Sequence, residues 1–300
     1  MTWRIGVDIG GTFTDAALVN EETSEIGIAK TLTTPGDFGE GVVNALKQAI
    51  EAYSVPPDTV SLLSHATTVV TNAILEEKGA RTALIATRGF RDILELRRSS
   101  RADLYDMFQD PPAVLVPRHR RLEITERIDA QGDVVIPLAQ DEIDQIVEEI
   151  KALNVDAVAV SLLFSFLNDS HERTLGEALR AALPETPVFL SSEVLPEIRE
   201  FERTSTTAIC AYVGPILDSY LSQLEEAVSG LNLPPLHVMG SAGGVVDVPE
   251  AIRMPAAVVE SGPAAGVIAA ALVGEQIGQS NLLSFDMGGT TAKASLIRKG

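Results

Sequence analysis

Two short stretches of this chain combine an acidic residue with a glycine turn, and both carry the pattern Asp-x-Gly-Gly-Thr. The first is IGVDIGGTFTDAALV at residues 5–19, and the second is LSFDMGGTTAKASLI at residues 283–297. Because glycine has no Cβ, the backbone N–H groups of such a turn can approach a phosphate closely and donate to it. A carboxylate at the end of the preceding strand can hold Mg²⁺ beside that phosphate, directly or through water. Each stretch therefore predicts a phosphate-binding turn with an adjacent metal site.

The two stretches align residue for residue, which a chance glycine hairpin would not explain. Asp8 aligns with Asp286, and the predicted nucleotide-phosphate-binding residues are Gly10, Gly11, Thr12 and Thr14 in the first stretch and Gly288, Gly289 and Thr290 in the second. Duplicated α/β domains that face each other across a cleft would place both turns on one nucleotide. We therefore expect Asp8 and Asp286 to be catalytic and to hold Mg²⁺, with one of them also able to orient the nucleophile. The pattern does not say which of the two has which role.

Asp15 and the segment around His65 add candidate residues. Asp15 lies either in the outer shell of the metal site or on the outward face of a strand. His65 stands at the end of a strand before a helix N-terminus, followed by Thr67 and Thr68, which is a favourable place for substrate or phosphate contact or for a structural histidine.

Two further segments have both a functional and a structural interpretation. Arg203 shares a helix face with other polar residues in EFERTSTT, which indicates either an anion or carbonyl site or a salt-bridged surface. Ser261 and Gly262 open a helix whose N-terminus can receive an anion.

The elements that must position these residues alternate as in a mixed α/β sheet. The pattern predicts strands over residues 3–9, 14–20, 25–32, 60–64, 82–87, 156–163, 187–192, 236–240 and 281–287. It predicts helices over residues 37–53, 69–80, 138–153, 169–183, 196–229 and 261–278. From residue 89 to about 135 the pattern loosens around a hairpin at 129–133, which indicates an inserted subdomain.

Composition narrows the classes of function. The chain has 300 residues with 23 Lys and Arg against 42 Asp and Glu, so its net charge of −19 disfavours binding to nucleic acid or to an anionic membrane. A bound phosphate must then be held by backbone groups and metal. The one cysteine, Cys210, is expected to be a buried small hydrophobe and excludes an internal disulfide framework. No targeting or membrane segment is evident, and we expect a cytoplasmic protein.

Nearly the whole chain resembles the N-terminal part of the hydantoinase A/oxoprolinase family, which belongs to the actin-like, sugar kinase and Hsp70-type ATPase superfamily. The resemblance lies in GVDIGGTFTD, HATTVVTNAILEEKGARTALIATRGFRDILELRR, LYD, LVPRHRRLEITERID, SSEVLPEIREFERTSTTAICAYV, SAGG, SGPAAGV and FDMGGTTAKASLI. It implies an α/β fold of duplicated ribonuclease H-like domains. The N-terminal domain would cover residues 1–195, with an α/β insertion at about 89–190, and the second ATPase domain would begin in residues 196–300. Since family members are considerably longer, the chain is expected to be a fragment.

The resemblance also implies an activity. It implies ATP and Mg²⁺ as cofactors, a B-type partner subunit in a hetero-oligomer, and a hydrolase that phosphorylates the carbonyl oxygen of a cyclic amide such as hydantoin or 5-oxoproline. The alternatives are the ATPase subunit of a ketone carboxylase and a nucleotide-driven switch or activator of the same fold. Two departures stand out. Ala66 replaces a glycine that the family often has, and Lys293 stands where many members have an acid. No role of that acid is therefore transferred to Lys293.

Overall fold

The computed structural model describes residues 2–10, 12–34, 38–99, 103, 105–109, 112–287 and 292–299. The chain divides into two compact units, one formed by residues 1–76 together with 217–300, and the other by residues 77–216. The sequence-based boundaries at about residues 89, 190 and 196 stay predictions.

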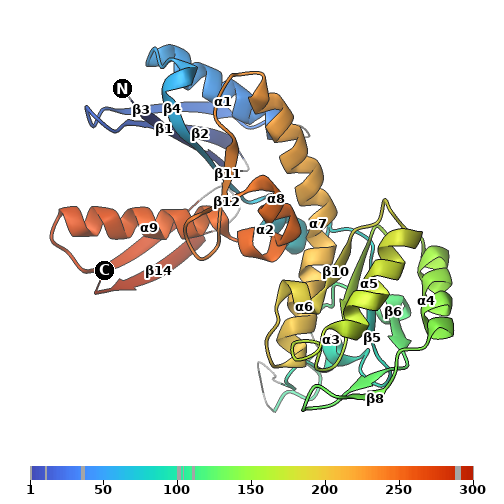
Figure 1. Ribbon diagram of the computed structural model, residues 1–300. Helices are drawn as coiled ribbons and strands as arrows, with labels where there is room; N and C mark the ends of the chain where they lie inside the picture. The colour runs from blue at the N-terminus through green and yellow to red at the C-terminus, as the bar shows by residue number, and fades with distance from the viewer. Residues whose placement is uncertain are drawn as a thin grey trace. The chain divides into compact units, whose positions relative to one another are not determined.

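The first unit is built on a six-stranded mixed sheet with the order β12-β11-β4-β1-β2-β3 (Figure 1). Its strands are β1 (Trp3–Ile9), β2 (Phe13–Asn20), β3 (Ile26–Leu32), β4 (Val60–Thr67), β11 (Leu236–Met239) and β12 (Val245–Asp247). The first three strands form an antiparallel meander, whereas β4 runs parallel to β1 and β11 runs parallel to β4. The carboxyl ends of β1, β4 and β11 therefore lie at one edge of the sheet.

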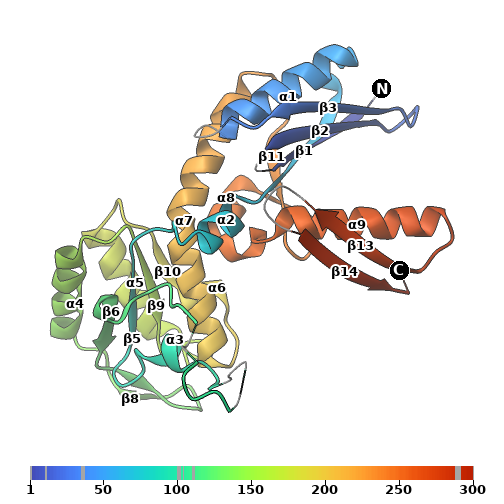
Figure 2. The same ribbon diagram turned by 180° about the vertical axis from the view of Figure 1, so that it is seen from behind.

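Alternating side chains explain why β1 forms here. Ile5, Val7 and Ile9 are buried in the core, while Arg4 and Asp8, at alternate positions of the strand, are exposed. Helix α1 (Phe38–Ala52) packs over β1, β2 and β3 and buries the apolar face that its sequence spacing predicts (Figure 2). The short elements between the strands are η1 (Pro57–Thr59), α2 (Val69–Leu75), α8 (Val248–Arg253) and η3 (Pro255–Val258).

A second hairpin in this unit is formed by β13 (Asn281–Met287) and β14 (Ala292–Arg298), and α9 (Ser261–Gln276) runs beside it (Figure 2). Leu282 packs against α9 so closely that a Cβ at Gly274 would lie 2.3 Å from its Cδ1. The opposite face of the hairpin is apolar and exposed. It carries Leu283, Phe285 and Met287, which are 63–72% exposed.

The second unit has a four-stranded parallel sheet with the order β10-β9-β5-β6. Its strands are β5 (Thr82–Thr87), β6 (Arg121–Ile124), β9 (Ala157–Ser161) and β10 (Val188–Leu190). Every residue of β5 and β9 is buried, as expected for parallel strands covered on both faces. Helices α4 (Gln140–Leu153) and α5 (Ser170–Ala182) contribute the leucines, isoleucines and valine that complete this core.

The remaining elements of the second unit are α3 (Ile93–Leu96), η2 (Arg118–Arg120), α6 (Ser191–Val194) and the small hairpin β7 (Arg127–Ile128) with β8 (Val134–Ile136). The hairpin confirms the one predicted around residues 129–133. Helix α7 (Glu200–Ser229) contributes its residues up to 216 to the second unit and the rest to the first. Cys210 is fully buried in α7, as predicted. None of the helices in the described ranges is both long and apolar enough to cross a membrane.

Candidate phosphate-binding site

Asp8 stands at the carboxyl edge of the first unit's sheet, one residue before the end of β1. Solvent reaches the residue, yet neighbouring protein atoms desolvate its carboxyl and raise its pKa above the usual 3.8. The negative charges of Asp15 and Asp286 raise the pKa of Asp8 further. Both residues that the sequence predicts as catalytic thus act electrostatically on one another. A divalent cation bound among these carboxylates would relieve their repulsion.

The turn after β1 is closed by internal hydrogen bonds. Gly10 N–H donates to the carbonyl of Phe13 over 2.9 Å, and a Cβ at Gly10 would lie 3.2 Å from that same oxygen. Thr33 Oγ1 donates to the Gly10 carbonyl at 2.9 Å and lies 3.1 Å from Thr14 Oγ1. Thr14 is therefore buried with its hydroxyl bonded inside the protein, whereas Thr12 is exposed beside the turn. Gly11 lies outside the described residues.

The end of β4 and the start of α9 meet beside Asp8. Ser261 Oγ donates to the Thr67 carbonyl at 3.0 Å and lies 3.2 Å from the Thr67 nitrogen. A Cβ added at Gly262 would lie 3.5 Å from Asp8 Oδ1 and 3.8 Å from the Thr68 methyl. The N-terminal end of a helix dipole thus lies next to the carboxylate.

His65 lies beneath this site rather than at its surface, since only 1% of the residue is exposed. Its Nδ1 lies 3.2 Å from the Val7 carbonyl, and its Nε2 lies 2.6 Å from the hydroxyl of Tyr220 on α7. Because a carbonyl only accepts, Nδ1 carries the proton and Nε2 accepts from Tyr220. Burial lowers the pKa of His65 from 6.5 to about 4, so the ring is neutral near pH 7. The predicted contact of His65 with substrate stays a prediction.

The two hairpins place different residues opposite their aspartates. In the first, Asp8 pairs across the strands with Asp15, which forms an ion pair with Lys30 at 2.8 Å. In the second, Asp286 pairs with Lys293, which forms an ion pair with Glu260. Gly288, Gly289 and Thr290 lie outside the described residues, so their predicted phosphate contacts are untested.

Arg203 belongs to the second unit and is fully buried there. Its guanidinium donates to the carbonyls of Leu162 and Glu197, each at 3.0 Å, and to Ser191 Oγ at 3.2 Å. Ser191 Oγ in turn donates at 2.6 Å to Glu172, a fully buried carboxyl. The arginine is thus engaged in a satisfied polar core, and its predicted role toward substrate stays a prediction.

The residues of the first unit suit a Mg²⁺–nucleotide. Asp8, Asp15 and Asp286 supply negative charge for a cation, and the α9 N-terminus beside Asp8 favours a nearby anion such as phosphate. Within the described ranges, no cluster of three or more His, Cys, Asp or Glu residues is arranged to hold a metal ion by itself.

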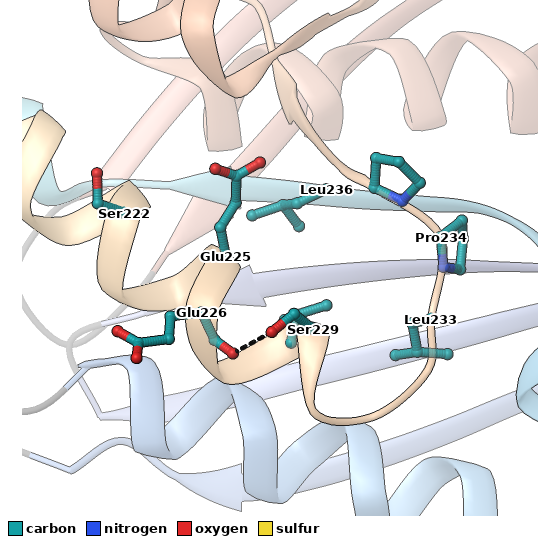
Figure 3. A pocket seen from close by; sticks show the side chains of 9 residues that line it. Ser222, Glu225, Glu226, Ser229, Leu233, Pro234 and Leu236 are labelled. Atoms are coloured by element: carbon teal, nitrogen blue, oxygen red, sulfur yellow. Dashed lines mark hydrogen bonds between the residues drawn. The ribbon is translucent and has the colours of Figure 1, made fainter.

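A pocket of about 550 Å³ lies elsewhere in the first unit, between the end of α7 and the segment leading into β11 (Figure 3). It is lined by Ser222, Glu225, Glu226, Val228, Ser229 and residues 233–236. The Ser229 hydroxyl, which donates to the Glu226 carbonyl at 2.7 Å, lies among them. None of the predicted site residues lines this pocket, so it is separate from the Asp8 site.

Comparison with known proteins decides the family. The profile of the hydantoinase/oxoprolinase N-terminal region matches residues 4–183, and the hydantoinase/oxoprolinase profile matches residues 203–300. The chain belongs to the hydantoinase/oxoprolinase family. The resemblance inferred from the sequence motifs is thereby confirmed.

Relatives and solved structures support the same fold. An uncharacterized protein of Methanocaldococcus jannaschii is 40% identical over 99% of this chain and 44% of its own length. Caprolactamase subunit alpha of Pseudomonas jessenii is 34% identical, again over 99% of this chain and 44% of that protein. The crystal structure of ATP-dependent caprolactamase from Pseudomonas jessenii matches 98% of this chain and 43% of that one, with a TM-score of 0.83 and 33% identity.

The nucleotide-free structure of acetone carboxylase, from work on ATP-dependent acetone carboxylation, matches 99% of this chain and 44% of that one, with a TM-score of 0.91 and 26% identity. The predicted α/β fold class is confirmed by these two structures. This hydantoinase/oxoprolinase chain spans less than half the length of the relatives that it matches.

Proposed function

We propose that the protein carrying this chain is an ATP-dependent hydrolase subunit that phosphorylates the carbonyl oxygen of a cyclic amide and so drives ring opening. The observation that carries the proposal is the convergence of Asp8, Thr68 and the α9 N-terminus at Gly262, with the charge of Asp286 acting on Asp8. Caprolactamase subunit alpha supports the substrate class, because a lactam is a cyclic amide.

The chemistry follows from how unreactive an amide is. The carbonyl oxygen forms a bond to the γ-phosphorus of ATP while the bond from that phosphorus to ADP breaks. Water attacks the activated amide carbon, and the ring C–N bond breaks as the nitrogen takes up a proton. A second water cleaves the resulting acyl phosphate into the carboxylate and inorganic phosphate. Phosphoryl transfer of this kind depends on positioning and on stabilising charge more than on covalent help from the protein.

Each residue of the site has a proposed part. When bound, Mg²⁺ would neutralise phosphate charge, and Asp8 and Asp286 would hold it directly or through water. Thr12, with the matching Gly288, Gly289 and Thr290, would donate to phosphate oxygens, while Gly10, whose N–H donates to Phe13, would allow the phosphate to approach the turn closely. The start of α9 at Gly262 would add its dipole to the same charge. Ser261 acts one step away, because its hydroxyl fixes α9 to Thr67.

A second candidate function is the ATPase subunit of a ketone carboxylase, where phosphate would go to the enol oxygen of a ketone. The observation that favours it is the higher TM-score with acetone carboxylase, 0.91 against 0.83 for caprolactamase. The higher identity with caprolactamase, 33% against 26%, supports the amide hydrolase. Either function would require a partner subunit of the B type, and the relatives' names as subunits support a hetero-oligomer.

The test is phosphate release from Mg-ATP by the complete polypeptide together with its co-purified partner subunit. Hydantoin, 5-oxoproline and caprolactam would each be supplied alone, and acetone and acetophenone would be supplied with and without bicarbonate. We expect a cyclic amide to stimulate release, and we expect Asp8→Asn and Asp286→Asn each to lower it about 100-fold or more. Asp58→Asn, at an exposed aspartate of the same unit, is the matched control.

The outcomes separate the candidates. Bicarbonate-dependent stimulation by a ketone would replace the amide hydrolase with the carboxylase. If neither aspartate variant differs from the control, the repeated turns are a feature of the fold alone and the proposed site is wrong.

A further inference from the structure

The two aligned hairpins differ by one reversal of charge. Seven residues after the first aspartate stands Asp15, and seven residues after the second stands Lys293. Each faces its aspartate directly across the strand pair, as Asp8 faces Asp15 and Asp286 faces Lys293. Directly opposed residues of an antiparallel pair share one face of the sheet, so Lys293 lies on the same face of its hairpin as Asp286.

Lys293 does not face its aspartate alone, since it also forms an ion pair with Glu260. The lysine side chain is 26% exposed and the glutamate side chain 44%. Glu260 is the residue immediately before α9, and its φ of +64° lies in the left-handed region that non-glycine residues seldom occupy. Its backbone N–H donates to Thr71 Oγ1 at 3.2 Å. The glutamate is therefore fixed at two points, which maintain an unfavourable backbone conformation.

The position of Glu260 connects the second hairpin to the first aspartate. Ser261, the next residue, bonds to Thr67 at the end of β4, and a Cβ added at the following Gly262 would lie 3.5 Å from Asp8 Oδ1. Contacts thus run from β14 through Lys293 and Glu260 to the start of α9, which lies beside Asp8. The aspartates of the two hairpins carry like charge, so an attachment is needed to hold them near one another.

We propose that the Lys293–Glu260 ion pair holds the β13–β14 hairpin to the start of α9 and thereby positions Asp286 opposite Asp8. This inference rests on the proposed phosphoryl-transfer function. Lys293 is a positioning residue that acts through Glu260 and Asp286. The competing role, direct contact of Lys293 with a phosphate, requires the lysine to leave Glu260 and makes the glutamate dispensable.

The test uses the complete protein with Lys293→Met, Glu260→Gln and the conservative variant Lys293→Arg, which keeps the positive charge opposite Asp286. Hydrogen exchange without any nucleotide is the first measurement. We expect Lys293→Met and Glu260→Gln to speed exchange about 10-fold at the amides of residues 264–266 and 283–287, and Lys293→Arg to keep protection. Lys30→Met, which breaks the exposed Asp15 pair on the first hairpin, is the matched control and should leave these amides unchanged.

Steady-state kinetics with Mg-ATP is the second measurement. We expect Lys293→Met and Glu260→Gln to lower kcat about 10-fold or more with a smaller change in KM, since small misplacement of a reacting group can cost on the order of 100-fold. Lys293→Arg should keep most of the activity. If Lys293→Met weakens nucleotide binding while Glu260→Gln does not, or if exchange is unchanged in both, the ion pair does not position the site and the inference is wrong.

The two proposals can fail separately. Faster exchange in Lys293→Met and Glu260→Gln with protection kept in Lys293→Arg, together with absence of ATP turnover in the wild-type protein, would overturn the proposed function. It would leave the ion pair as the attachment of the hairpin. Normal ATP turnover, together with hydrogen exchange that the variants do not change, would overturn the role of the ion pair and leave the proposed function in place.

Discussion

At the scale of single residues, the buried His65 makes the acid stability of the first unit testable. Its pKa is about 4 in the folded protein against a usual 6.5, so the unfolded chain binds its proton first as pH falls. The histidine therefore costs no stability above pH 6.5 and destabilises the fold progressively as pH falls from 6.5 to 4, by up to about 3 kcal/mol. We expect His65→Gln to remove this part of the slope. Urea unfolding of both proteins from pH 4 to pH 7 measures it.

The comparison between variants isolates the histidine. The raised pKa values of Asp8 and Glu172 act in the opposite sense, but both groups are present in the wild type and in the variant. His237→Gln, on β11 of the same unit, controls for the change of side-chain type. Equal slopes for the wild type and His65→Gln would contradict the buried neutral ring.

The same residues show what sequence can predict at this scale. Asp8 and Asp286 were predicted as site residues because their surroundings are repeated, and their catalytic role stays a prediction. Tyr220 was missed, since one tyrosine in a 30-residue helix gives no local signal and its partner His65 is 155 positions away. The helical spacing around Arg203 was compatible with a surface role and with a site role. In the structure the arginine is instead buried, and its guanidinium donates to Leu162 and Ser191. Such acceptors are supplied by tertiary folding and leave no trace in the local pattern.

At the scale of elements, two glycines of α9 predict opposite effects of the same substitution. A Cβ at Gly274 would lie 2.3 Å from Leu282 Cδ1 and 2.7 Å from the Gln279 carbonyl, whereas a Cβ at Gly266 meets nothing within 4 Å. We expect Gly274→Ala to destabilise the first unit by about 1–3 kcal/mol through overpacking. Gly266→Ala should stabilise it by up to about 1 kcal/mol, because alanine is the better helix former. Thermal unfolding of both variants measures the difference.

The Gly266 variant serves as the control for helix propensity within one helix. If both alanines stabilise the protein to a similar extent, the close packing of α9 on β13 is not present in solution. A loss in both would indicate that the open space at Gly266 is filled by other atoms.

The elements themselves were predicted unevenly, for identifiable reasons. The expected bounds of β1, β5 and β13 were confirmed, since each has a clear apolar pattern between turn residues. The strand β6 was missed because its four residues lie in the irregular stretch, and it is stabilised by parallel pairing with β5. The helix expected over 69–80 ends at Leu75, and Glu77 adopts a positive φ of 55°. Local propensity could not anticipate either outcome.

At the scale of the whole molecule, the chain order and the spatial order differ. The second unit is one continuous segment, residues 77–216, while the first is assembled from two segments that flank it. The sequence indicated an insertion because its hydrophobic pattern loosens after residue 89. It could not indicate that the first part of α7 belongs with the insertion, because a helix gives the same pattern on both sides of such a boundary.

This division predicts that residues 77–216 fold by themselves, whereas residues 77–199 do not. The longer fragment keeps the parallel sheet, its covering helices and Arg203. The shorter fragment loses Arg203, whose guanidinium donates to Ser191 Oγ and to the Leu162 carbonyl in the polar core around Glu172, and it also loses the apolar contacts of α7. We expect cooperative thermal unfolding by circular dichroism for 77–216 and none for 77–199.

In the longer fragment, Ile85→Ala should lower the free energy of unfolding by about 2–4 kcal/mol, while Val134→Ala, at a residue that is 48% exposed, should lower it little. If 77–216 is unfolded, or if 77–199 folds equally well, the compact unit does not end where α7 enters the first unit.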